Sequence, residues 1–579
     1  MIVRDITKFD ISGKKERDAV RKIKDFIESN VCLEGRILLL YGLRRTGKTT
    51  MLEQTVNCYK ATRKCAFYEI EDGDSMEDVK YILSKEHEKG TEIVCLDEIT
   101  KANNFIAKAS FIPDVFAKYG MNVLVTGTDS LGLLFAHEDE LFNRDDVVSS
   151  THISFAEHCR VLGTDDMDNY IRYGGLMHKG LELAAIHDYK SAVRYLDSAV
   201  GNNIANSVSK CRRDNPLKSL YPTEITCIIE KMVEDYSGHF EISVMQDSLD
   251  KVVFMHPLSR AFSDIAKNTE ETRETKEEKI IRMFAERINA DKRVKNTVTP
   301  EMVDEFEYLL DYMHVASMIN VFVFRERAGH WQRRGDTYTN HIVQPAIKYN
   351  HLVQSQKLAT SGDVWAQLPD SEKDELLRQM EDKTFGDMTE QIVLFDVNAQ
   401  LKGERYEVGK PVFYGKLGGL RSGEYDMLVR DKKEKLYWAF EVKHTDVVTS
   451  RQGRHLLRKD LEEAIEFQFV KKKNVAILYN GGAFQDKSGI VYLNVSDFLL
   501  SVDKNRDMEK VFFELSNGIP IHDLSIEKEV RIPRAVAQAN DFELTSRKKK
   551  DAVRTSLKPK AFTAFVDGNG GPAGGRGDD

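Results

Sequence analysis

The feature that most constrains this chain is a glycine-rich loop near its N-terminus. Residues 42–50 read GLRRTGKTT, a complete G-x-x-x-x-G-K-[ST] pattern, and they follow the apolar run at residues 37–41. A strand, such a loop and then a helix present backbone N–H groups and the positive end of a helix dipole to a polyphosphate. A mere glycine-rich turn with a surface lysine fits this context poorly. The sequence therefore predicts a nucleoside triphosphate site, with ATP as the expected ligand.

The residue types of this loop assign the contacts with the nucleotide. Lys48 is expected to reach the β- and γ-phosphates, and the Thr49 hydroxyl is expected to hold Mg²⁺. The loop residues predicted to bind the nucleotide are Gly42, Arg45, Thr46, Gly47, Lys48, Thr49 and Thr50.

Composition limits the class of protein. A chain of 579 residues exceeds what one hydrophobic core usually supports, so several domains are expected. No stretch approaches the roughly 18 uninterrupted apolar residues that a membrane helix needs, and the N-terminus lacks the pattern of a signal peptide. The seven cysteines are scattered and form no C-x-x-C pair, which argues against structural zinc. These features predict a cytoplasmic protein, and the net charge of −9 permits only a local nucleic-acid groove.

Two further apolar runs end in polar residues, as strands beside a nucleotide do. The run at residues 93–96 leads into Asp97, expected to support Mg²⁺, and Glu98, expected to orient or deprotonate the attacking water. A later run leads into Thr126, and either Thr126 or Thr128 is expected to sense the γ-phosphate.

Two later features leave alternatives open. Asp129 and Ser130 follow the sensor strand, where capping of the next helix explains them nearly as well as a catalytic role. Arg144 would neutralise transition-state charge in its own or a neighbouring subunit, unless it is an ordinary exposed arginine.

The order of these motifs resembles the prokaryotic AAA-type ATPases of the archaeal-ATPase group. In that family a GR pair, an LSFxEF stretch and a YLxxGG stretch follow the sensor strand. Here Asn143 replaces the glycine before Arg144, His158 replaces the second phenylalanine, and residues 153–157 and 170–175 read ISFAE and YIRYGG. The resemblance implies an ATPase core of the additional-strand P-loop class followed by a helical lid. It also favours Arg144 as a finger or sensor arginine; such a finger often works across a subunit boundary, so a homo-oligomer is expected.

The middle of the chain is predicted to be mainly helical. From about 180 to 300 apolar positions recur at helical spacing, which suits lid and connecting helices. Between 301 and 345 a helix, an apolar strand and a basic loop describe a winged-helix module. Trp331 would offer a ring for stacking, and four arginines around it would offer cations for DNA phosphates: Arg325, Arg327, Arg333 and Arg334. A hairpin tip that merely carries soluble residues is the alternative.

A second group of ionisable residues occurs further on. Glu441 and Lys443 alternate along an apolar strand, so they share one face of it. Glu424 and Asp426 share a face of the preceding strand, and a hairpin of the two strands would gather three carboxylates and one lysine. Such a group repels itself unless a divalent cation lies between the carboxylates, and the lysine would then position or activate water. A surface ion pair is the simplest alternative for Glu441 and Lys443.

This D-x(14)-E-x-K arrangement resembles the PD-(D/E)xK nucleases, in which metal-bound acids and a lysine hydrolyse phosphodiesters. That fold also uses a glutamate on an earlier helix, which Glu390 supplies here. The resemblance implies catalytic roles for Glu390, Asp426, Glu441 and Lys443, with Mg²⁺ or Mn²⁺ on Asp426 and Glu441. Some members have eroded sites, and the four intact residues favour activity. A phosphate track is expected downstream at Arg451, Arg454, His455, Arg458 and Lys459.

Together these patterns predict an α/β multidomain chain: a P-loop ATPase with a parallel sheet, helical lid and winged helix, then a PD-(D/E)xK nuclease-like α/β domain. The expected parts are an N-terminal extension (1–30), the AAA-type ATPase core (31–162), a lid with connecting helices (163–300), a winged-helix-like module (301–355), the nuclease-like domain (375–500) and a C-terminal extension with a flexible tail (501–579). The expected function is ATP hydrolysis coupled to a metal-dependent DNA nuclease, in defence or mobile-DNA maintenance. The alternative is a nucleotide-dependent switch or scaffold whose nuclease-like domain binds DNA or protein without cleaving.

Overall fold

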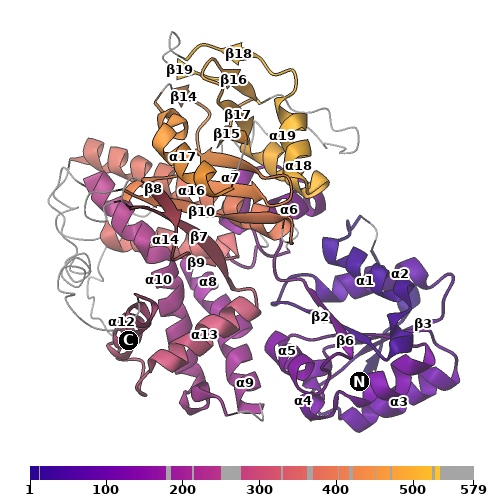
Figure 1. The fold of residues 1–579 in the computed structure, drawn as a ribbon. Coiled ribbons are helices and arrows are strands. Elements are labelled where there is room, and N and C mark those ends of the chain that lie inside the picture. The colour runs from indigo at the N-terminus through magenta and orange to yellow at the C-terminus, as the bar shows by residue number, and fades with distance from the viewer. Residues whose placement is uncertain are drawn as a thin grey trace, which may run out of the picture. The chain divides into compact units, whose positions relative to one another are not determined.

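The fold is known from a computed structural model (Figure 1). The structure describes residues 1–11, 13–177, 184–210, 214–249, 276–327, 330–360, 369–401, 403–415, 421–449, 451–469, 472–524 and 529–534. These residues belong to one unit of the chain, Met1–Arg534. The predicted flexible tail lies outside the described residues.

The N-terminal region is built on a six-stranded sheet with the order β1-β3-β4-β5-β2-β6. All of its pairings are parallel except that of β1 with β3. β5 lies between β2 and β4, so an additional strand separates the P-loop strand from the strand that ends at Asp97. The strands are β1 (Ile2–Val3), β2 (Ile37–Tyr41), β3 (Cys65–Glu69), β4 (Ile93–Asp97), β5 (Asn122–Thr126) and β6 (Asp145–Ser149).

Alternate residues of β2 pack on opposite faces of this sheet, because side chains alternate along a strand. Leu38 and Leu40 pack with α1 (Asp18–Ser29) and α2 (Lys48–Tyr59). Leu39 packs on the other face, in the cluster that includes α3 (Met76–Glu88) and α5 (Ser130–Glu138). Every residue of β2, β4 and β5 is buried, as continuous apolar strands in a covered parallel sheet should be.

Helices follow the ATPase sheet, as the sequence predicted. Leu43 of the P-loop belongs to the same apolar cluster as Leu196 of α8 and Phe306 of α13, so the core of the helical region reaches the nucleotide loop. The helices are α6 (Phe155–Leu162), α7 (Met167–Tyr173), α8 (Tyr189–Leu196), a π-helical turn (Asp197–Gly201), α9 (Asn202–Lys210), α10 (Pro222–Leu249), α12 (Lys276–Asn289), α13 (Pro300–Tyr312) and α14 (Pro345–Ala359).

The C-terminal region contains an eleven-stranded sheet whose main path is β18-β16-β17-β15-β13-β12-β10-β7-β8, with β11 beside β10 and β9 beside β7. Its strands are β7 (Ala316–Arg327), β8 (His330–Arg333), β9 (Thr337–Ile342), β10 (Tyr406–Tyr414), β11 (Arg421–Glu424), β12 (Met427–Asp431), β13 (Leu436–Val442), β15 (Lys472–Tyr479), β16 (Phe484–Asp486), β17 (Val491–Asn494) and β18 (Ile521–His522). A separate small pair joins β14 (Val448–Thr449) to β19 (Glu529–Val530).

Helices cover both faces of this sheet. α16 (Asp370–Gln400) and α18 (Val495–Asn505) pack on the face that carries Trp438, Phe440 and Val442. α17 (Lys459–Phe469) packs on the opposite face. β12 is antiparallel to β10 and β13, and β15 is parallel to β13. In chain order these elements are α16, β10, β12, β13, α17 and β15.

The predicted helix and hairpin at 301–345 are present, but they differ from a separate winged-helix module. β7 pairs in parallel with β10, which makes the hairpin part of the C-terminal sheet. Trp331 is only 9% exposed and lies 6.1 Å from the ring of Phe413, so the expected stacking ring is a core residue. The Trp331 side chain points from β8 into the core, because burial of its large apolar surface is favourable.

Candidate nucleotide site and a second ionisable cluster

The P-loop joins the end of β2 to the start of α2, and both of its pattern glycines are required by geometry. A Cβ at Gly42 would lie 2.1 Å from Ser150 Oγ, closer than atoms can approach. Gly47 has φ 87°, in the left-handed region that glycine adopts at little cost. The loop therefore needs glycine at both positions, as the motif predicted.

Lys48 projects from the first turn of α2 into this loop. Its Nζ donates to Gly42 O at 2.6 Å and Leu43 O at 3.0 Å, and the residue is 8% exposed. Burial lowers the pKa of Lys48 to about 8, against the opposing effect of the Glu98 and Asp97 carboxylates. A desolvated ammonium at the loop is placed to bind phosphate oxygens.

Thr49 and Asp97, the two predicted Mg²⁺ residues of the ATPase, meet directly. Thr49 Oγ1 donates to Asp97 Oδ2 at 2.8 Å. Burial raises the pKa of Asp97 to about 6, although the Thr49 hydroxyl opposes the shift. Within the described ranges no group of three His, Cys, Asp or Glu side chains could hold a metal ion alone. The pair fits Mg²⁺, which ordinarily completes its shell with nucleotide phosphates and water.

Glu98 follows at the end of β4 with φ 59°, a left-handed conformation that is uncommon for glutamate. Its Oε2 accepts from Thr128 N at 3.1 Å and from Thr128 Oγ1 at 2.8 Å. Thr128 therefore orients the predicted base. Thr126 is fully buried at the end of β5, and its hydroxyl has no hydrogen-bond partner in the described part of the chain. Of the two sensor candidates, Thr126 is the one with a donor still to satisfy.

The residues after the sensor strand cap a helix. Asp129 accepts from Gly132 N at 2.9 Å, the bond of an N-cap residue at the start of α5. Ser130 Oγ donates to Gly42 O at 2.6 Å. Asp129 is therefore a helix N-cap, as the capping alternative proposed, and Ser130 holds the first residue of the P-loop by a hydrogen bond.

Arg144 lies at the opposite end of the sheet from the P-loop. It directly precedes β6, whose first residue is in register with Ile37 at the start of β2, whereas the P-loop follows Tyr41. Five strand residues span roughly 16 Å. The guanidinium pairs with Asp114 at 2.9 Å. This geometry contradicts a role of Arg144 at the nucleotide of its own chain, and a role across a subunit boundary stays a prediction.

The second cluster lies where β12 begins and β13 ends. Lys443 Nζ forms an ion pair with Glu441 Oε1 and lies 3.9 Å from Asp426 Oδ2. His455 Nε2 lies 2.7 Å from the other oxygen of Glu441, and Val442 N donates to Asp426 Oδ2 at 2.8 Å. The structure therefore brings Asp426, Glu441 and Lys443 together. Glu424 and Asp426 do not share one strand as predicted, because Glu424 ends β11 and Asp426 precedes β12, and the side chain of Glu424 lies outside what the structure describes.

Glu390 joins the same electrostatic group from α16. Its carboxylate lies 2.5 Å from Lys410 Nζ of β10, a lysine that the sequence interpretation missed because nothing near it in the chain marks it as a site residue. Burial raises the pKa of Asp426 well above its usual range, and the charges of Glu390 and Glu441 raise it further. The hydrogen bond with His455 and the Lys443 ammonium hold the pKa of Glu441 below its usual value despite burial. The four predicted residues thus interact electrostatically.

The predicted phosphate track divides into two kinds of residue. Arg451, Arg454 and Lys459 are exposed, whereas Arg458 pairs with Asp460. They lie on a turn, a 3-10 helix (Arg454–Leu457) and the start of α17.

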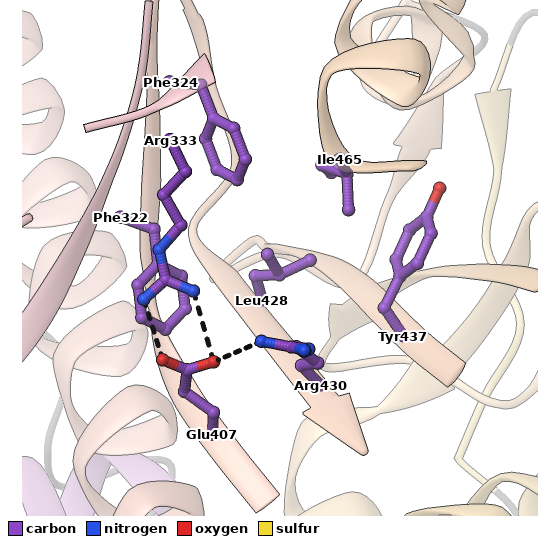
Figure 2. Close-up of a pocket in the computed structure, with 8 residues that line it drawn as sticks. All are labelled: Phe322, Phe324, Arg333, Glu407, Leu428, Arg430, Tyr437 and Ile465. Atoms are coloured by element: carbon purple, nitrogen blue, oxygen red, sulfur yellow. Dashed lines mark hydrogen bonds and ion pairs between the residues drawn. The ribbon is translucent and has the colours of Figure 1, made fainter. Parts of the chain in front are cut away.

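A small pocket opens on the α17 face of the C-terminal sheet (Figure 2). Glu407 lines it and accepts hydrogen bonds from Arg333 at 2.7 Å and from Arg430 at 3.1 Å. Apolar side chains such as Phe322 also line it. Its volume is about 10 Å³, room for about one water molecule and too little for a small-molecule ligand. The arginines are neutralised within the protein, so the pocket is not a candidate site.

Comparison with known proteins identifies the N-terminal site. Residues 34–159 match the family model described as an AAA domain, which is a minority of the chain. That region is an AAA-type P-loop ATPase domain. A chain of the S. cerevisiae Hsp104:casein complex in its extended conformation is 13% identical, with 69% of this chain and 85% of that chain covered, but a TM-score of 0.22 carries no argument about the fold. No curated protein matches this chain.

No helix within the described ranges is both long and apolar enough to cross a bilayer.

Proposed function

We propose that this chain binds and hydrolyses ATP and that this cycle controls a C-terminal domain of the PD-(D/E)xK nuclease type that acts on DNA. The observation that carries the ATPase half is the meeting of Lys48, the Thr49–Asp97 pair and Glu98 beside one P-loop. A setting in defence or mobile-DNA maintenance is an extension of this proposal.

The roles at the ATPase site follow from these contacts. Lys48 binds the β- and γ-phosphates, while Thr49 and Asp97 would hold Mg²⁺, which supplies charge neutralisation at the phosphates when bound. Glu98, held by Thr128, orients the attacking water and accepts its proton. Thr126 donates its hydroxyl toward the γ-phosphate. No covalent enzyme intermediate is needed, because phosphoryl transfer depends on positioning and charge.

Two variants test the ATPase proposal. Lys48→Ala should lose nucleotide binding, because no other ammonium reaches the loop's Gly42 and Leu43 carbonyls among the described residues. Glu98→Gln should bind ATP like the wild type but hydrolyse it about 10²- to 10⁴-fold more slowly. Fluorescent-nucleotide titration and phosphate release measure the two effects. Normal turnover by Glu98→Gln would show that Glu98 is not the base.

The nuclease half is supported by the charge balance of the second cluster. Glu390, Asp426 and Glu441 interact there with the two lysines Lys410 and Lys443. Three carboxylates, of which Asp426 and Glu441 are buried, against two ammonium groups favour one further cation, and Mg²⁺ or Mn²⁺ suits oxygen ligands. Asp426 and Glu441 would hold that ion. Lys443 would position the attacking water.

A cleavage assay tests the nuclease proposal. The full chain is incubated with a panel of DNA and RNA substrates and with Mg²⁺ or Mn²⁺, with and without ATP. The wild type should cleave DNA, and the Asp426→Ala and Lys443→Ala variants should not. Asp382→Ala, on the exposed side of α16, is the control and should cleave like the wild type. Cleavage that persists in both variants would refute the site assignment.

A nucleotide-dependent switch is the second candidate, and one observation favours it. Glu441 already has both of its oxygens occupied, one by Lys443 and one by His455. In this candidate function Glu441 stays paired with Lys443 and His455, holds no metal ion, and the domain binds DNA or protein without cutting. No cleavage under any condition, together with ATP-dependent DNA retention, would support this candidate.

Coupling between the two halves is supported by a buried contact. Asp396, on the same helix as Glu390, lies 3.0 Å from His152 Nε2 and accepts from Phe155 N at 2.8 Å. His152 O in turn accepts from Arg17 beside the P-loop. We therefore propose that nucleotide binding reaches the second cluster through α16. Asp396→Asn should keep ATP hydrolysis but lose the ATP dependence of cleavage or DNA binding, whereas the control Asp382→Asn should keep both. An Asp396→Asn protein that still responds to ATP would contradict this route.

Assembly into a homo-oligomer is also proposed, because Arg144 reaches no nucleotide of its own chain. Sedimentation with and without ATP tests it, and mixing Arg144→Ala with Lys48→Ala chains tests whether the arginine acts on a neighbour. A strictly monomeric wild-type protein with full activity would exclude that role.

A further inference from the structure

Successive carbonyl oxygens of the P-loop each accept a hydrogen bond, and most of the donors lie outside the loop. The bonds are Ser130 Oγ to Gly42 O (2.6 Å), Thr46 Oγ1 to Leu43 O (2.9 Å), Tyr195 OH to Arg44 O (2.8 Å), Met177 N to Arg45 O (2.9 Å) and Arg17 Nη1 to Thr46 O (2.5 Å). The C=O and N–H of a trans peptide point in opposite directions. A carbonyl held on one side therefore turns the next amide N–H to the other side.

Arg17 is the most heavily committed of these donors. It precedes α1, is 6% exposed, and uses all five of its N–H groups. Nε and Nη2 bind the two oxygens of Glu157 at 2.7 and 2.9 Å, while the remaining bonds reach Thr46 O, Ser150 O (2.9 Å) and His152 O (3.0 Å). Only a planar fork can serve these acceptors at once, so a lysine cannot replace it.

Tyr195 contributes from the lid. It lies on α8, is 6% exposed, and its ring packs in the cluster that also contains Leu43 of the loop. Its hydroxyl donates to Arg44 O. The position of the Arg44–Arg45 peptide is thus set by a helix about 150 residues further along the chain.

We propose that Arg17 and Tyr195 are positioning residues of the nucleotide site. By holding Thr46 O and Arg44 O, they turn the Gly47 and Arg45 amides toward the phosphates of the nucleotide. Neither amide has an acceptor in the described part of the chain. Both positioning residues lie outside the matched residues 34–159, so the N-terminal segment and the lid complete the AAA domain's phosphate site. This inference rests on the proposed nucleotide binding.

Steady-state ATP hydrolysis by the full chain tests the proposal. Arg17→Lys should raise KM about ten- to a hundredfold, since bonds from a charged donor are the strongest of their kind, and Tyr195→Phe should raise it about three- to tenfold. Both should leave kcat within about twofold, because the amides bind ground state and transition state alike. The controls are Arg21→Lys, exposed one turn further along α1, and Tyr189→Phe at the start of α8.

The split between KM and kcat separates positioning from simple structural support. Partial unfolding would lower the active fraction and hence kcat, and it would leave KM unchanged. If Arg17→Lys fails to fold, Tyr195→Phe decides, because it removes one hydroxyl only. Unchanged KM in folded variants would overturn the inference while leaving the proposed function intact. A wild type without turnover would instead refute the proposed hydrolysis, and titration with ADP would then give the same test through Kd.

Discussion

The two polar sites of this chain treat their charges in opposite ways. At the nucleotide site, among the described residues, the Lys48 ammonium donates only to the Gly42 and Leu43 carbonyls, and the Thr126 hydroxyl has no hydrogen-bond partner. At the second cluster, Lys443 pairs with Glu441 and lies near Asp426. The first site leaves donors open toward a ligand, whereas the second satisfies its charges largely within the protein.

This difference has energetic consequences. Burying the Lys48 ammonium in the P-loop costs desolvation free energy, as its lowered pKa indicates. The phosphates of a bound nucleotide would offset that cost. A lysine between buried carboxylates instead offsets their repulsion in the folded chain. The same residue type therefore serves ligand binding in one site and stability in the other.

The largest expected effect comes from replacing the two lysines by methionine. Lys443→Met should destabilise the C-terminal region by about 2–3 kcal/mol, because it removes the ammonium that lies beside the Glu441 and Asp426 carboxylates. The full 3–5 kcal/mol of a buried pair is not expected, since the lysine side chain is 35% exposed. Lys48→Met should leave the melting temperature unchanged and abolish nucleotide binding. Thermal unfolding of the full chain measures both. Equal destabilisation by the two variants would remove the contrast between the sites.

A second effect concerns the orientation of Glu98. Thr128→Val keeps the shape of the side chain but removes the hydroxyl that binds Glu98 Oε2 at 2.8 Å. We expect kcat to fall about tenfold and KM to stay constant, because a misaligned base affects the chemical step alone. Phosphate release at saturating ATP is the measurement. A change in KM instead would place Thr128 among the groups that bind the nucleotide.

Much of this arrangement follows from local sequence pattern. Glycines, Lys48 and Thr49 lie in one short motif, and alternation along a strand places Glu441 and Lys443 on one face. These relations need no knowledge of distant pairing. The predicted positions of Thr49 and Asp97 also hold, since the carboxyl ends of parallel strands meet at one edge of the sheet.

What the sequence concealed depends on contacts between distant segments. Arg17 and Tyr195 carry no motif, and their value arises only from where the P-loop carbonyls point. Arg144 is placed far from its own nucleotide by the register of β6 with β2. Trp331 was expected at a surface because basic residues surround it in the chain, whereas the pairing of β7 with β10 buries it against Phe413.

The pH dependence of nucleotide binding gives a third, smaller effect. In the free protein Lys48 has a pKa of about 8, below the ordinary 10.5, so it is charged below pH 8 and increasingly neutral above it. Bound phosphates favour the charged form. Binding therefore takes up a proton above pH 8. Between the pKa of about 6 of Asp97 and pH 8, Kd for ADP should be flat, and above pH 8 it should rise at most tenfold per pH unit. Calorimetry in two buffers of different ionisation enthalpy would detect the proton. A flat profile to pH 10 would mean that Lys48 stays charged without ligand.

The smallest expected effect extends the comparison to the basic hairpin. Arg327 and Arg334 are exposed, whereas Arg333 is bound by Glu407 at 2.7 Å and by Asp336. If the hairpin contacts DNA phosphates, Arg327→Ala and Arg334→Ala should each reduce the slope of log K against log salt by about one, because each removes one released counterion. Arg333→Ala should leave the slope unchanged, since its charge is already neutralised within the protein.

DNA affinity measured across a salt series tests this. An equal loss of slope for all three arginines would show that DNA can displace Glu407, and an ion pair inside the protein would then be no guide to which cations bind a ligand.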